Sequence, residues 1–84
     1  MTKDDLDYLC SIAKTLGNKH FSVTAMHKAV YPNRHRAWAV IDQDKLKKIM
    51  SRLVRDEFAI ESEGVRGGAG WTLTNAGINV AAKH

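Results

Sequence analysis

Basic side chains are concentrated in the middle of the chain, where their residue types suit contact with phosphate groups. Residues 21–56 hold eight lysines and arginines against three aspartates, whereas basic and acidic residues are equal in number in residues 1–20. Lysine and arginine supply the hydrogen-bond donors that phosphate oxygens accept. With a net charge of +4 over 84 residues, this concentration predicts one polyanion-binding face rather than a uniformly basic surface.

An amphipathic helix over residues 42–56 is expected to position most of these cations, with Asp42 as its cap. Its apolar residues recur three and four positions apart, as one stripe of a helix requires. They are Leu46, Ile49, Met50, Leu53 and Val54. The residues that face the other way are Asp44, Lys48, Ser51, Arg52 and Arg55.

A hairpin is predicted over residues 57–73, because the apolar period changes to two directly after Asp56. Phe58 and Ile60 alternate with their neighbours in a first strand, 57–62. A glycine-rich tip, 63–70, precedes a second strand, 71–73. The tip sequence GVRGGAG lacks the lysine and serine or threonine of a phosphate-cradling loop, so the glycines are expected to serve the turn.

Three further helices are expected, over residues 4–16, 23–31 and 74–83. Thr2 and Asp5 form a capping-box-like start for the first helix. Either Ser22 or Thr24 can cap the second, and Thr74 the last. The connector 18–22 is expected to hold one short strand with Phe21 buried.

The stretch 32–41 is long for a turn between two helices. Trp38 is expected to lie in the core, as large aromatic side chains usually do. Arg34 and Arg36 lead into the basic helix, so a phosphate contact is expected of them. The alternative is that both arginines are simply solvated.

Tyr8 and Ile12 lie one turn apart, beside the apolar stripe of the first helix. Two interpretations stay open for them: they border the core, or they form a dimer contact together with Ile78 of the last helix.

No residue pattern indicates catalysis, a metal or a cofactor. The four histidines and the single cysteine, Cys10, lack the spacing of a zinc site, and isolated surface histidines are expected. The serines and carboxylates match no catalytic pattern. We therefore expect no enzyme. The chain has one cysteine, no apolar run of membrane-spanning length and no signal-peptide pattern, so we expect a single cytoplasmic domain.

The order of helix, short helix, basic helix, ribbon and short helix resembles a winged helix-turn-helix domain. The stretch LKKIMSRLVRDEFAIESEGVRGGAGWTLTNAG is similar to the core of bacterial and archaeal regulators of the MarR and PadR families. Leu73, Thr74 and Gly77 match the start of the helix that follows the wing in those families. The resemblance covers about residues 21–80. The link between the second and third helices is longer here, and the long flanking helices of those families are missing.

The resemblance implies a mostly α fold with a small β-hairpin (α+β), namely a three-helix core plus wing and a short C-terminal helix. It implies a cytoplasmic homodimer that binds double-stranded DNA and regulates transcription. Helix 42–56 would enter the major groove, and the wing, 61–70, would lie near the minor groove. The candidate contacts are Arg34, Arg36, Asp44, Lys45, Lys47, Lys48, Ser51, Arg52, Arg55 and Arg66. Glu61 and Glu63 oppose this assignment unless they point away from phosphates.

Two other functions remain open at this point. A winged-helix domain can serve as a protein–protein adaptor, because a fold does not fix a function. The same basic face would also suit structured RNA or a replication origin.

Overall fold

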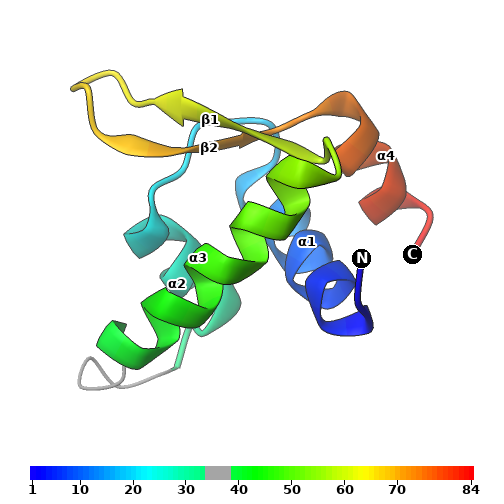
Figure 1. Cartoon of the computed structure of the whole chain (residues 1–84), viewed down its shortest axis with the longest axis horizontal. Coiled ribbons are helices and arrows are strands. Elements are labelled where there is room, and N and C mark those ends of the chain that lie inside the picture. Colours follow the sequence, from blue (N-terminus) through cyan, green and yellow to red (C-terminus); the bar gives the residue numbers. More distant parts are fainter. Residues whose placement is uncertain (34–38) are drawn as a thin grey trace.

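The computed structural model describes residues 1–33 and 39–84, and the side chains of residues 39–41 are not described. In this part of the chain four helices accompany a two-stranded antiparallel hairpin, so the fold is compact α+β (Figure 1). The elements are α1 (Lys3–Leu16), α2 (Val23–Val30), α3 (Ala39–Arg55), β1 (Ala59–Glu63), β2 (Ala69–Leu73) and α4 (Asn75–Ala82). The predictions for Arg34, Arg36 and Trp38 lie outside the described residues.

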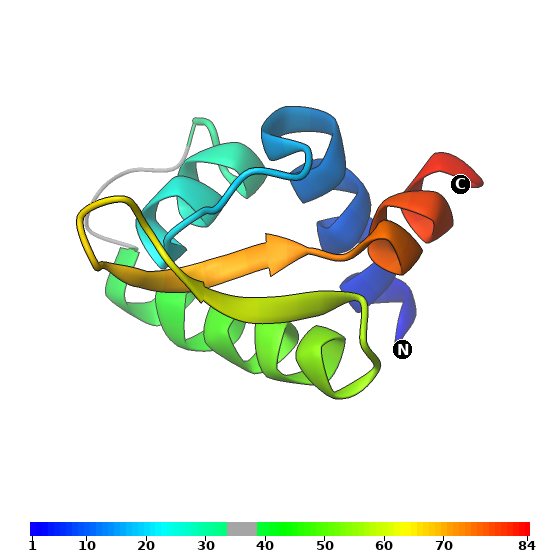
Figure 2. The same cartoon turned by 90° about the horizontal axis from the view of Figure 1, so that it is seen from above.

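The core lies where α1, α2 and α3 meet beneath the hairpin. The hairpin lies across these helices, with α3 on one side and α1 and α2 on the other (Figure 2). α4 packs against α1 at the end away from the hairpin tip. The buried apolar side chains are Leu9, Ile12, Phe21, Met26, Leu46, Ile49, Met50, Leu53, Ala59 and Leu73. Each helix contributes to this core or borders it, so the helices hold one another in place.

The starts of three helices follow the predicted capping chemistry, including that of α4, where the Thr74 hydroxyl accepts from the Gly77 amide at 3.1 Å. The Thr2 hydroxyl accepts a hydrogen bond from the Asp5 amide at 3.1 Å, and the Asp5 carboxylate accepts one from the Thr2 amide at 3.5 Å. This is the predicted capping box. Ser22, rather than Thr24, caps α2 by accepting from the amide of Ala25.

α3 begins at Ala39, three residues before the predicted start, and Asp42 is therefore not its cap. Asp42 lies within the first turn and is buried. Its carboxylate accepts a hydrogen bond from Nε2 of His27 at 3.0 Å. The expectation of isolated surface histidines is thus wrong for His27, which is also buried. The cause is that α2 and α3 pack against each other, so the two polar groups satisfy one another inside the fold.

The chain leaves α3 through a turn in which Glu57 adopts a positive φ of 66°. The Phe58 amide donates to the Leu53 carbonyl and the Glu57 amide to the Val54 carbonyl, the bonding pattern of a Schellman motif. This turn determines which side chains of β1 face the core and which face the solvent. Ala59 is buried, whereas Ile60, one of the apolar residues from which the strand was predicted, is 54% exposed and faces the solvent.

The hairpin pairs Ala59 with Leu73 at its base and Glu63 with Ala69 near its tip. The connector before α2 adds one further bridge on the other edge of β2. Phe21 and Trp71 exchange two backbone hydrogen bonds of 2.9 Å, and Phe21 is buried as expected. β2 therefore lies between β1 and the connector (Figure 2).

None of the helices in residues 1–33 and 39–84 is both long enough and apolar enough to cross a membrane.

Candidate nucleic-acid interface

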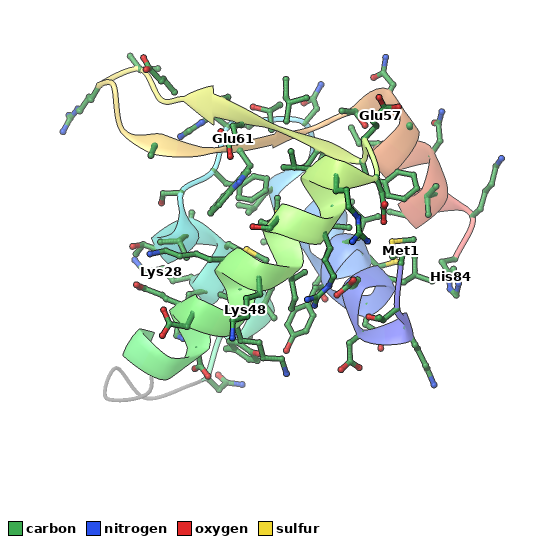
Figure 3. All side chains as sticks on the ribbon, viewed as in Figure 1. Met1, Lys28, Lys48, Glu57, Glu61 and His84 are labelled. Atoms are coloured by element: carbon green, nitrogen blue, oxygen red, sulfur yellow. The ribbon has the colours of Figure 1, made fainter. Side chains whose placement is uncertain are left out.

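One side of α3 is open to solvent between Asp44 and Arg55. We define the outer ridge as Asp44, Lys48, Ser51 and Arg55, which are all exposed and follow one another at intervals of four, three and four residues. Figure 3 shows Lys48 on this outer side of the helix. The opposite stripe of α3 is held in the core, so the ridge is presented on a rigid rod.

Lysines flank the ridge on both sides. Lys47 lies on the side of the hairpin, and Lys45 on the side of α1, where its Nζ is 5.4 Å from the ring centroid of Tyr8. Both lysines are exposed. The cation–π contact orients Lys45 without covering its ammonium group. Three lysines thus present their charge to the solvent from the middle of α3.

Arg52 does not join the outer ridge, although its sequence position suggested that it would. Its Nε and Nη2 donate to the two carboxylate oxygens of Asp5, each at 2.8 Å, and its side chain is only 39% exposed. The Arg52 hydrogen bond lowers the pKa of Asp5 against the opposing effect of burial, and the same bond raises the pKa of Arg52. Arg52 therefore holds α3 to the start of α1.

Two other predicted contacts make short-range hydrogen bonds, one inside α3 and one to the residue that follows it. The Ser51 hydroxyl donates to the Lys47 carbonyl, four residues back, at 3.0 Å. Nε of Arg55 lies 3.3 Å from the carboxylate of Asp56, but the Arg55 side chain stays 67% exposed. Neither bond removes its residue from the surface.

A hollow of about 660 Å³ separates α3 from the underside of the hairpin. It is lined by Val23, Lys47, Glu61, Ser62, Glu63, Ala69, Gly70 and Trp71. Glu61 projects from β1 toward α3 (Figure 3). The two carboxylates therefore do not point away from the basic helix, and the hollow carries one lysine against two glutamates.

The hairpin tip carries one basic residue. Arg66 is exposed in the loop 64–68, which is closed by a hydrogen bond from the Gly64 amide to the Gly68 carbonyl at 2.8 Å. Gly67 has a φ of 78°, a conformation that favours glycine. The loop that carries Arg66 forms the free end of the hairpin, apart from α3 (Figure 1).

A polar chain fixes the base of the tip, and the sequence offered no signal for it. Nδ1 of His20 lies 2.9 Å from the Ser62 hydroxyl, which lies 2.8 Å from the Thr72 hydroxyl. His20 comes from the connector, so its partner is 42 residues away in the chain. These hydrogen bonds join both strands to the connector. The expectation of an isolated surface histidine is therefore wrong for His20 as well.

The structure does not place Tyr8, Ile12 and Ile78, the residues of the predicted dimer contact, on one exposed surface. Ile12 is wholly buried in the core, so it cannot touch a second chain in this fold. The reason is that α4 and α2 cover α1 on two sides. Tyr8 is half-buried and its hydroxyl bonds to that of Tyr31. Ile78 lines a separate hollow of about 270 Å³ between α1 and α4.

In the described ranges, no three His, Cys, Asp or Glu residues gather into a group that could hold a metal ion. The expectation that the chain is not an enzyme stays a prediction. No protein-family model, curated protein or solved structure matches this chain.

Proposed function

We propose that this protein binds duplex DNA as a sequence-specific regulator of transcription, with a winged helix-turn-helix fold. In this proposal α2 and α3 form the helix-turn-helix, and the hairpin is the wing. The Phe21 bridge beside β2 supports this, because it joins the connector before α2 to the hairpin in one small sheet.

The observation that carries the proposal is the row of exposed cations on α3. Lys45, Lys47 and Lys48 project from a helix whose other side is locked into the core. With 17 residues, α3 is about 25 Å long. A helix of this size fits the major groove, where lysines can contact phosphates and guanine edges.

A homodimer is part of the proposal, since one small domain makes few contacts and two half-sites multiply its affinity. The hollow beside Ile78, between α1 and α4, is lined mainly by half-buried apolar side chains and is the surface that we assign to the second copy.

The test replaces Lys47 and Lys48 with alanine and measures duplex binding by fluorescence anisotropy between 50 and 200 mM salt. We expect roughly a tenfold or larger loss of affinity and a salt slope reduced by about two, because each lysine that meets a phosphate releases counterions. The substituted side chains are exposed, so the thermal unfolding midpoint should stay nearly the same.

The matched control replaces Lys3 and Lys83, which are exposed on α1 and at the end of α4. It removes the same charge from elements other than α3 and should leave the salt slope nearly unchanged. If both double variants lose the same affinity for duplex DNA, the binding is a general attraction of charges and α3 has no special part in it. Competitors of RNA and single-stranded DNA, added to the wild-type complex, test the choice of duplex DNA.

A further inference from the structure

Asp44 is an acidic residue on an otherwise basic or neutral ridge. It is exposed and lies one turn before Lys48 on the outer ridge. Within the described part of the chain it makes no side-chain hydrogen bond or ion pair, unlike Asp5, Asp42 and Asp56, whose carboxylates all have partners. Asp4 and Asp7 on α1 are unpaired in the same way, but Asp44 is the unpaired aspartate on the outer ridge, so no contact among the described residues accounts for its place there.

An unpaired carboxylate on a DNA-binding ridge is costly unless the DNA supplies a donor. Phosphates and guanine edges present only acceptors to it, and like charges repel. An ionised carboxylate is itself an acceptor only. In the major groove the donors are the amino groups of cytosine and adenine. In adenine the amino group lies next to the N7 acceptor, which repels a carboxylate, whereas the cytosine amino group has no such neighbour.

We propose that Asp44 determines sequence specificity by accepting a hydrogen bond from the N4 amino group of a cytosine. The inference rests on the proposed function, because it requires the outer ridge to face base edges. Asp44 belongs to the outer ridge and lies in the N-terminal half of α3, the part of a recognition helix that meets base edges. The lysines supply affinity for DNA of any sequence, and Asp44 restricts tight binding to sites with a cytosine at the contacted position.

The experiment selects preferred duplexes from a random pool with the wild-type protein, then measures affinities for every single-base variant of the selected site. We expect one position at which cytosine is preferred by about tenfold or more. Asp44→Ala should lose the preference at that position alone and bind unselected DNA more tightly. Asp44→Asn should move the preference toward adenine, because an amide both donates and accepts.

The control is Asp7→Asn, the same loss of charge on the exposed side of α1, which should change no base preference. If Asp44→Ala tightens binding equally on all sequences and every base preference stays, the carboxylate is only a repulsive charge and the inference is overturned. If the wild-type protein does not retain duplex DNA in the first selection, the proposed function fails instead.

Discussion

α3 and the hairpin lie side by side but differ in charge and in how firmly they are held. α3 carries five basic residues and two acidic ones, whereas residues 57–73 carry three glutamates and one arginine. α3 buries Leu46, Ile49, Met50 and Leu53 almost completely. The hairpin leaves Ile60 and Val65 in solvent. In the proposed function, α3 would supply affinity from a fixed position, and the acidic hairpin would limit where the DNA can lie.

The largest expected effect tests the difference in anchoring. Leu53→Ala removes a side chain that is wholly buried beneath α3, and it should lower the free energy of unfolding by about 3 kcal/mol. Ile60→Ala shortens a side chain on β1 that is 54% exposed, so it should change the free energy of unfolding by no more than about 0.5 kcal/mol. Urea unfolding monitored by circular dichroism measures both. Similar losses would contradict the contrast between the two regions.

A second prediction concerns the close contact that fixes the hairpin. A Cβ at Gly70 would overlap the carbonyl oxygen of Phe21, so Gly70→Ala should break the bridge between the connector and β2. We expect a loss of about 2 kcal/mol in stability, as for other overpacked sites. Gly68→Ala, which meets open space at the tip, is the control and should be nearly neutral. Equal stability of the two variants would rule out the tight approach.

The third prediction is a pH dependence at the link between α3 and α1. Arg52 lowers the pKa of Asp5 below its ordinary 3.8, so the ionised pair stabilises the fold above that pH. This contribution should be lost as the pH falls below about 3.8 and through the lowered pKa. Asp5→Asn should therefore reduce stability at pH 7 and flatten its decline in acid. Asp4→Asn, which changes an exposed neighbour, should leave the decline unchanged.

The smallest expected effect tests the acidic underside of the hairpin. Neutralising both glutamates of the hollow, Glu61→Gln with Glu63→Gln, should tighten duplex binding by about three- to tenfold at 50 mM salt. The gain should shrink at higher salt, because screening weakens repulsion. Glu57→Gln, at the far end of the hairpin, is the control (Figure 3). An equal gain from this control would remove any special role of the hollow.

The fold class and the order of elements were predictable because they depend on local signals. Apolar spacing indicated α3, and side-chain capping indicated the starts of α1 and α4. The phase of the hairpin was not predictable in the same way, since it depends on the left-handed turn at Glu57. That residue type rarely signals such a conformation.

The candidate site was predictable in its lysines but not in Arg52. A helical wheel places Arg52 on the polar side, and only the packing of α1 shows that Asp5 lies beside it. The two residues are 47 positions apart, and a capping box explains Asp5 completely at the local level. The pairings of His20 and His27 were missed for the same reason, because each partner comes from a distant element.

The double bond between Phe21 and Trp71 has a mechanical consequence. Ser22, the cap of α2, directly follows Phe21. A displacement of β2 should therefore also displace the first turn of α2. Whatever bends the hairpin on a bound surface will also pull on the helix that packs against α3. The hairpin and α2 are thus joined through the connector, and we expect a displacement of one to displace the other.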